Sequence, residues 1–203
     1  MTGRILSFVS ALILALTTSP VYAQATTWQI DPVHTSTQFG VKHMMVSTVR
    51  GQFTRTTGTV VWDGKDPSSA VVNIAIDAAS IDTHEPARDN HLRSPDLLDV
   101  AKYPTITFKS TKVDVVGPDR ARVTGDLTIR GVTRQVVLDV EGPSEPVKDP
   151  TNVTRIGASA TTKISRKDFG LIWNKVLEGG GVVVGDAVAI TIDVEIVRLP
   201  AGK

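Results

Sequence analysis

Apolar and polar residues alternate with a period of two along most of the chain from residue 28 onward. In the segment 121–129 the odd positions are apolar or small and the even positions are polar or charged, and 132–140 repeats the pattern after a tight turn at Arg130-Gly131. Such alternation indicates strands with one buried face. The remaining segments with this pattern are 28–43, 51–62, 69–77, 105–115, 154–164 and 187–198. The sequence therefore predicts an all-β domain of eight strands.

Eight consecutive short strands separated by turns favour a closed up-and-down barrel or a β-sandwich. Closure removes exposed strand edges, and an eight-stranded barrel can be filled by its own side chains or can hold one small ligand. Two connections break the strand pattern. The first, near residues 84–100, predicts a short helical segment in which Thr83 and Ser94-Pro95 are candidate starts. The second is the glycine-rich segment 168–185, and we expect both connections at a barrel mouth.

The N-terminus has the features of a secretory signal. Arg4 precedes an apolar run at 5–16, and Val21-Tyr22-Ala23 forms a small-x-small cleavage site. The apolar run is shorter than the roughly 20 residues that a membrane-spanning helix needs. We therefore expect residues 1–23 to be removed, leaving one domain at 24–203 that is periplasmic or secreted.

Composition excludes several classes of function. Lys and Arg number 22 against 21 Asp and Glu, so the chain lacks the positive charge that nucleic-acid binding needs. The absence of cysteine excludes disulfides and thiolate chemistry. The sequence has no Gly-x-Ser-x-Gly, His-Glu-x-x-His or phosphate-loop motif, and His84 and His91 lie two helical turns apart, too far for one metal ion. We expect a protein that is not an enzyme and holds no metal or cofactor.

If the apolar side of each strand faces inward, the barrel interior is lined almost entirely by apolar side chains. Ala121, Gly125, Ala158 and Ala160 would make parts of the wall thin. Alternation alone leaves two interpretations open, a solid core or a cavity for a long apolar chain. The candidate ligand-contacting residues are Phe39, Val41, His43, Phe53, Trp62, Val72, Ile74, Ile76, Ile106, Phe108, Val123, Leu127, Val136, Leu138, Ala158, Ala160, Trp173, Ile190 and Ile192.

Charged residues gather in the expected helical segment. One interpretation is a pair of exposed salt bridges, Arg88 with Asp89 and Arg93 with Asp96, each contributing little stability. The other is a polar collar for a lipid head group formed by Arg88, His91 and Arg93, since arginine donors match phosphate geometry.

Several motifs, in order and at similar spacing, resemble the YceI-like polyisoprenoid-binding family. They are WQIDPVHT at 28–35, FGVKH at 39–43, VRGQF at 49–53, SIDT at 80–83, RDNHLRS at 88–94, YPTITF at 103–108, GDLTIRGVT at 125–133, and RKDFG at 166–170 with GD at 185–186. The resemblance implies a lipocalin-like antiparallel barrel of eight strands, usually periplasmic, with a long isoprenoid or related amphiphile inside. Leu97 departs from the phenylalanine that the family typically carries there.

Two functions follow as hypotheses. In the first, the barrel carries or stores an isoprenoid, a quinone or an acyl lipid unchanged, with transient contact to a membrane or to membrane redox proteins. In the second, the protein is an enzyme or redox accessory, and His43 or the Arg88-Asp89 pair acts on a quinone or a lipid head group.

Overall fold

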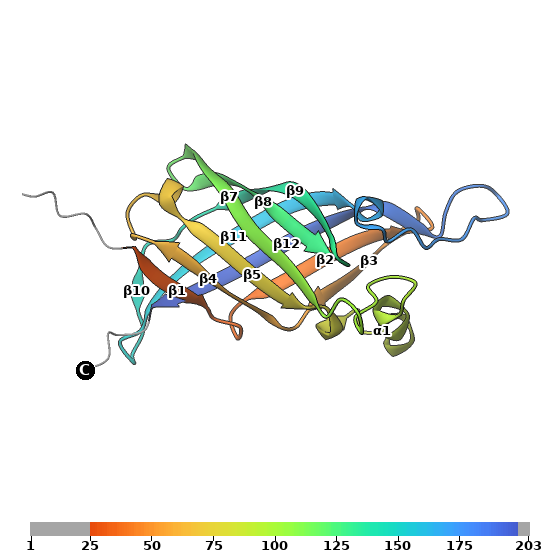
Figure 1. Ribbon diagram of the computed structural model, residues 1–203, viewed down its shortest axis with the longest axis horizontal. Coiled ribbons are helices and arrows are strands. Elements are labelled where there is room, and N and C mark those ends of the chain that lie inside the picture. Colours follow the sequence, from red (N-terminus) through yellow and green to blue (C-terminus); the bar gives the residue numbers. More distant parts are fainter. Residues whose placement is uncertain (1–24, 199–203) are drawn as a thin grey trace, which may run out of the picture.

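The structure is a computed structural model that describes residues 25–198 (Figure 1). The expected signal at 1–23 lies outside this range. The strands are β1 Thr26–Ile30, β2 Ser36–His43, β3 Ser47–Phe53, β4 Thr56–Trp62, β5 Val71–Asp77, β6 Ile81–Asp82, β7 Thr105–Gly117, β8 Arg120–Ile129, β9 Val132–Glu141, β10 Val147–Lys148, β11 Thr154–Ser165 and β12 Val184–Arg198. The helices are α1 Pro86–Arg93 and the short 3-10 turns η1 Pro67–Ser69, η2 Ala78–Ser80 and η3 Arg166–Phe169.

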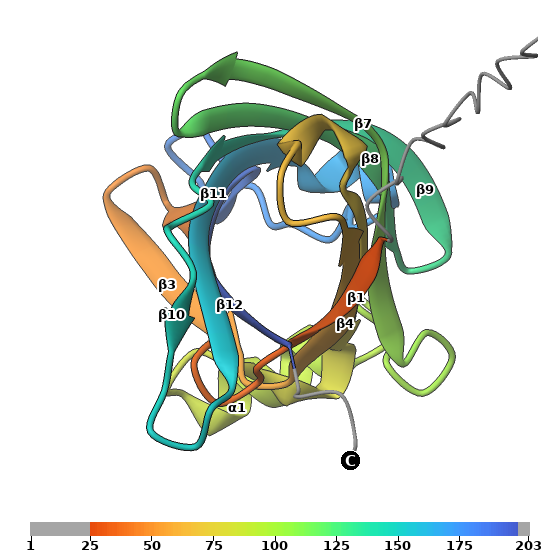
Figure 2. The ribbon, with the colours of Figure 1, turned by 90° about the vertical axis from the view of Figure 1, so that its left-hand side faces the viewer.

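These strands close into an eight-stranded antiparallel barrel (Figure 2). Three wall strands are interrupted, so that β1 with β2, β3 with β4, and β5 with β6 each act as one strand. The ring closes where β12 pairs with β11 along one edge and with β1 and β2 along the other. The predicted fold is therefore confirmed, although the sequence analysis missed the interruptions within these three strands.

Two strands begin three or four residues earlier than the alternation predicts. β3 starts at Ser47 instead of residue 51, and β12 starts at Val184 instead of 187. The first part of β3 pairs with β2, and β6 joins it only at Gln52 and Phe53. Because this part of the hairpin has a strand on one side only, no alternation of buried and exposed residues marks it.

The helical segment is shorter than expected and starts at a different residue. Glu85 caps α1, its carboxylate accepting a hydrogen bond from the Ala87 backbone N–H at 3.2 Å, and Pro86 occupies the first turn. Ser94 ends the helix and Pro95 starts no second one. The turns that follow bury Leu97 and Leu98, so the apolar residues there serve packing against the barrel.

Two apolar clusters line the interior of the barrel. At the end covered by α1, Leu98 and Phe169 pack with Phe108 and neighbouring wall residues. At the other end Trp28 and Trp62 pack together, with ring centroids 6.3 Å apart. In residues 25–198 no helix is both long enough and apolar enough to cross a membrane.

Candidate functional site

An apolar cavity of about 440 Å³ occupies the barrel interior. It reaches from Trp62 and Ile196 at one end to Arg88, His91 and Trp173 at the other. A packed protein core contains few voids larger than a water molecule, which takes up about 30 Å³ of liquid volume. The interior is therefore a ligand-sized space, and of the two interpretations the cavity describes this structure.

The cavity wall contains every residue that the sequence analysis predicted to contact a long apolar chain. The contact with a ligand itself remains a prediction. These wall residues are Phe39, Val41, His43, Phe53, Trp62, Val72, Ile74, Ile76, Ile106, Phe108, Val123, Leu127, Val136, Leu138, Ala158, Ala160, Trp173, Ile190 and Ile192.

Gly125, expected to widen the cavity, does not. A Cβ at this position would lie 2.4 Å from the Phe108 ring and 2.6 Å from the Lys109 carbonyl oxygen. The glycine therefore makes room for Phe108, whose ring forms the wall in its place. Ala121, by contrast, does line the cavity.

Some wall residues were missed. Val188, Val194 and Ile196 share the parity of Ile190 and Ile192, so the alternation could have identified them. Leu97 and Leu98 come from a connection without periodicity. No sequence signal marks Leu98, and only the resemblance to the family drew attention to Leu97.

A polar pair was also missed inside the apolar lumen. The hydroxyls of Thr37 and Thr56 hydrogen-bond to each other at 3.0 Å, and both residues are buried. Each hydroxyl therefore already has a hydrogen-bond partner within the protein and does not need one from a ligand.

Arg88 and His91 stand at the α1 end of the cavity. Arg88 donates from Nε to the Thr83 hydroxyl at 2.8 Å and from Nη2 to the Thr83 carbonyl at 2.9 Å. Within residues 25–198 its Nη1 has no hydrogen-bond acceptor, which leaves that nitrogen available to a ligand. The His91 ring meets the Trp173 ring edge-on, with centroids 4.6 Å apart. These side chains frame this end of the lumen.

Arg93 does not lie on the cavity wall. It donates to the carbonyls of Ala79 and Ile81 and so ties α1 to the segment before it. The alternative interpretation predicted salt bridges from Arg88 to Asp89 and from Arg93 to Asp96, and both pairings are wrong. Asp89 is buried and accepts from the Thr83 backbone N–H at 2.9 Å, and Asp96 pairs with His91 at 3.3 Å.

Arg166 is a second cation at this end of the cavity, and sequence reasoning did not propose it. Its buried guanidinium donates to the carbonyls of Gly185 and Trp173, each at 2.9 Å, and to that of Leu171. Burial lowers the pKa of Arg166, and Asp186 nearby opposes this shift. The side chain fixes the start and the end of the connection between η3 and β12. Nothing in the sequence around a single arginine at the end of a strand predicts that its side chain is buried.

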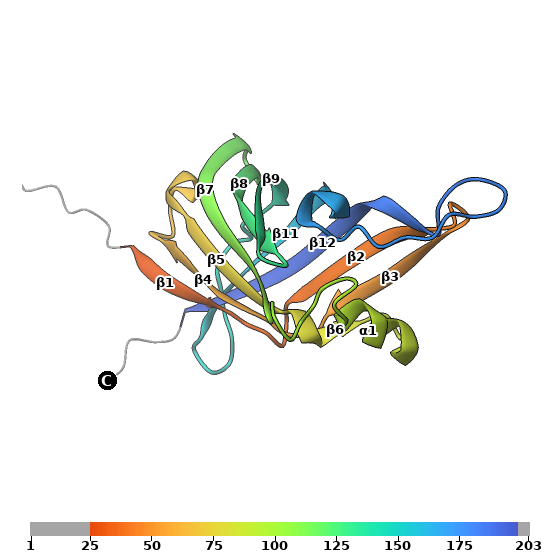
Figure 3. The same cartoon turned by 45° about the vertical axis from the view of Figure 1, so that its right-hand side comes forward.

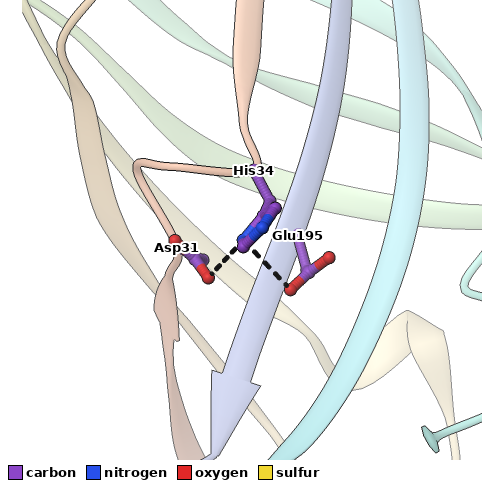
Figure 4. Close-up of side chains that lie close together, drawn as sticks. All are labelled: Asp31, His34 and Glu195. Carbon is purple, nitrogen blue, oxygen red and sulfur yellow. Dashed lines mark hydrogen bonds and ion pairs between the residues drawn. The ribbon is translucent and has the colours of Figure 1, made fainter. Parts of the chain in front are cut away.

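Asp31, His34 and Glu195 bring three potential metal-ligating atoms within 4.8 Å of one another outside the lumen (Figure 4). However, Arg155 Nη1 lies 2.7 Å from Asp31 Oδ2 and also contacts the Glu195 carboxylate. Its Nε contacts Asp149 at 2.9 Å. Because a guanidinium already neutralises the carboxylates that would ligate an ion, the cluster is an ion-pair network that fastens the β1–β2 corner to β11 and β12.

This network shifts the protonation of its members. Hydrogen bonds from His34 and Arg155 hold the pKa of Asp31 well below its ordinary value, and those from Thr151 and Arg155 lower the pKa of Asp149 to about 2. Hydrogen bonds to Glu195 and the two aspartates raise the pKa of Arg155. Asp31 and Asp149 are therefore charged and paired at neutral pH.

Known proteins share this fold and much of this sequence. The YceI-like domain model matches residues 28–196. Protein YceI of Salmonella newport is 38% identical over 173 residues, which cover 84% of this chain and 88% of that protein. The crystal structure of the Campylobacter jejuni YceI protein is 30% identical, with a TM-score of 0.66 over 78% of this chain and 90% of that one. A polyisoprenoid binding domain from Saccharophagus degradans, 17% identical, has a TM-score of 0.62 over 85% of this chain and 98% of that one. The chain therefore belongs to the YceI family.

Proposed function

We propose that the protein binds one long-chain isoprenoid or related amphiphilic lipid in its barrel and carries or stores it unchanged. The observation that carries this proposal is the apolar cavity of about 440 Å³. The fold shared with the polyisoprenoid binding domain of S. degradans supports an isoprenoid as the ligand class. A quinone or an acyl lipid would use the same apolar wall.

The wall chemistry accounts for a preference for long chains. Each buried methylene contributes about 0.8 kcal/mol, so one five-carbon isoprene unit gains about 3–4 kcal/mol before association costs. Among the described residues that line the cavity there is no Asp or Glu, so no carboxylate has to lose its hydration when the chain enters.

The lipid head group would lie at the α1 end. Arg88 and His91 line this part of the cavity, and Arg166 adds positive charge beside it. A phosphate would accept hydrogen bonds from Arg88, whereas a quinone carbonyl would offer a weaker, uncharged acceptor.

An enzyme or redox accessory is the second candidate, and its acid–base chemistry would rest on His43 or His91 on the wall. Incubation of the protein with isotope-labelled polyprenyl phosphate, or with labelled quinone and an added two-electron reductant, followed by extraction and mass spectrometry, separates the two functions. A carrier returns the labelled lipid unchanged. Appearance of a dephosphorylated or reduced product that depends on His43 or His91 would instead establish the enzyme.

The place where the protein works is also part of the proposal. The apolar run at 5–16 and the Val21-Tyr22-Ala23 site support export to the periplasm or beyond, with Gln24 as the first residue of the mature chain. Mass spectrometry of the protein from its native envelope tests this, and an intact Met1 would contradict it.

A further inference from the structure

The β2–β3 hairpin and the loop before β12 end in exposed apolar side chains. Met44, Met45 and Val46 form the hairpin turn and are 42%, 66% and 83% exposed, and Val176 on the loop is 83% exposed. We call these four residues the apolar tip. Figure 3 shows the hairpin and the loop projecting together beyond the barrel wall and α1. Unlike apolar residues scattered singly over a surface, the tip is a local cluster, and such clusters mark interaction sites.

The tip holds apolar residues at positions where local structure favours others. Met44 and Met45 have positive φ angles of 50° and 61°, and the Val46 N–H donates to the His43 carbonyl at 3.0 Å. Turns with two positive φ angles favour Asn and Gly, because other L-residues pay a steric cost there. Folding of the hairpin therefore does not explain the methionines, whereas a role in contacting a partner does.

The tip lies beside one mouth of the cavity. His43, directly before the tip, and Val184, directly after the loop, both line the cavity. The Met44 N–H donates to the Val183 carbonyl at 2.8 Å, which holds the hairpin against the loop, and Val176 bridges to Val182 across the loop. Anything that binds the tip therefore sits next to the head-group end of the lumen.

Charges around the tip favour an anionic surface. Residues 41–50 contain Lys42 and Arg50 and no carboxylate, while the loop at 171–183 contains Lys175 and Glu178. Apolar side chains flanked by an excess of cations are typical of segments that enter the interface of anionic bilayers.

We propose that the apolar tip inserts into the surface of a bilayer containing anionic lipids and so holds the α1 end of the cavity against the membrane. The inference rests on the proposed function, since a lipid that leaves a bilayer for the lumen needs a path that avoids water. Met45 and Val176 enter the acyl boundary, and Lys42 and Lys175 stay with the lipid head groups.

Binding to vesicles of phosphatidylethanolamine and phosphatidylglycerol, compared with vesicles of phosphatidylcholine alone, tests the tip. The protein is used after export, with its N-terminus verified. The Met45→Asn variant removes an apolar side chain and keeps a residue that favours positive φ, so the fold is retained. We expect Met45→Asn to weaken binding to the anionic vesicles roughly tenfold, the effect of losing one buried apolar side chain. Val116→Asn is the matched control, because Val116 is 55% exposed on β7 at the barrel end away from α1, and its binding should equal that of the wild type (Figure 1).

A single label gives a second measurement. Because the chain has no cysteine, Met45→Cys and Val116→Cys each offer one site for an environment-sensitive fluorophore. Emission should shift to the blue on anionic vesicles for the label at 45 and stay constant for the label at 116. Equal responses at the two sites, or no binding by the wild type, would overturn the proposal. A third result would also overturn it. If the protein without vesicles has twice the mass of one chain and the label at 45 is already buried, the tip is a contact between two copies.

Lipid extracted from the purified wild type is measured in parallel. If the lumen holds lipid but the protein does not bind vesicles, the membrane contact is refuted and the proposed function is retained. Vesicle binding that depends on Met45 in a protein whose lumen never holds lipid would support the membrane contact and refute the proposed function.

Discussion

The wall position Ala160 offers a direct way to block the lumen. Ala160 lies midway along β11, paired with Val140 on β9 and Ile192 on β12, and its methyl group faces the cavity. In the Ala160→Trp variant the indole projects into the cavity of about 440 Å³ instead of into packed side chains. We expect the variant to fold and to lose ligand.

The size of the effect follows from the ligand carbons that the indole displaces. Excluding one five-carbon unit from the wall removes about 3–4 kcal/mol of binding free energy, which raises Kd by two to three orders of magnitude. If position 160 were instead part of a solid core, overpacking would cost about 1–3 kcal/mol of stability. For a domain of this size such a loss lowers Tm by roughly 2–4 °C per kcal/mol.

Thermal unfolding and lipid recovery are measured on the same preparations. Thr161→Trp is the control, because Thr161 is the exposed neighbour on the outer face of β11. The account predicts that Ala160→Trp keeps its Tm after delipidation and recovers far less lipid, whereas Thr161→Trp changes neither. A destabilised Ala160→Trp protein with normal lipid content would refute the assignment of an open lumen at this position.

Three further changes test other parts of the structure. Gly125→Ala should lower the free energy of unfolding by about 1–3 kcal/mol in urea titrations, because the new Cβ would collide with Phe108. Gly157→Ala is the control and should leave the free energy of unfolding nearly unchanged, because a Cβ there has no neighbour closer than 3.9 Å. His34 and Arg155 hold the pKa of Asp31 below its ordinary 3.8, and Thr151 and Arg155 do the same for Asp149. The unfolding free energy of the wild type should therefore fall as pH drops from 3.8 towards about 2, and Arg155→Met, which removes the second cause at each aspartate, should make that fall shallower. An equal slope in both proteins would show that the network contributes no pH dependence. Arg88→Ala should weaken binding of a polyprenyl phosphate more than that of the uncharged polyprenol, and equal losses in a binding titration would make Arg88 purely structural.

The barrel was predictable because a strand has a fixed side-chain period. Once the alternation in a segment such as 121–129 is recognised, every second residue is assigned to the inside, and the structure places Val123 and Leu127 there. The sequence does not encode the cavity volume so directly. Gly125 has the same parity, yet its small size makes room for the Phe108 ring instead of for a ligand. Only the packing in three dimensions shows which of these two purposes a small wall residue serves.

Polar contacts were harder to predict, because they depend on residues far apart in the chain. Arg155 and Asp31 are 124 residues apart and meet only after the barrel closes. The same holds for Arg166, whose acceptors are backbone carbonyls that the sequence does not distinguish from others. The partners of Arg93 show the same limit, since a charge pattern suggests carboxylates while the structure supplies carbonyls.

Native mass spectrometry of the protein isolated from its own envelope measures whether the barrel holds a lipid. We expect one adduct per chain, with the mass of a single long-chain lipid that is released intact. This adduct should be lost in Ala160→Trp and kept in Thr161→Trp. Protein that emerges empty under conditions that preserve noncovalent complexes, or that carries only small polar molecules, would contradict a lumen built to hold a lipid chain.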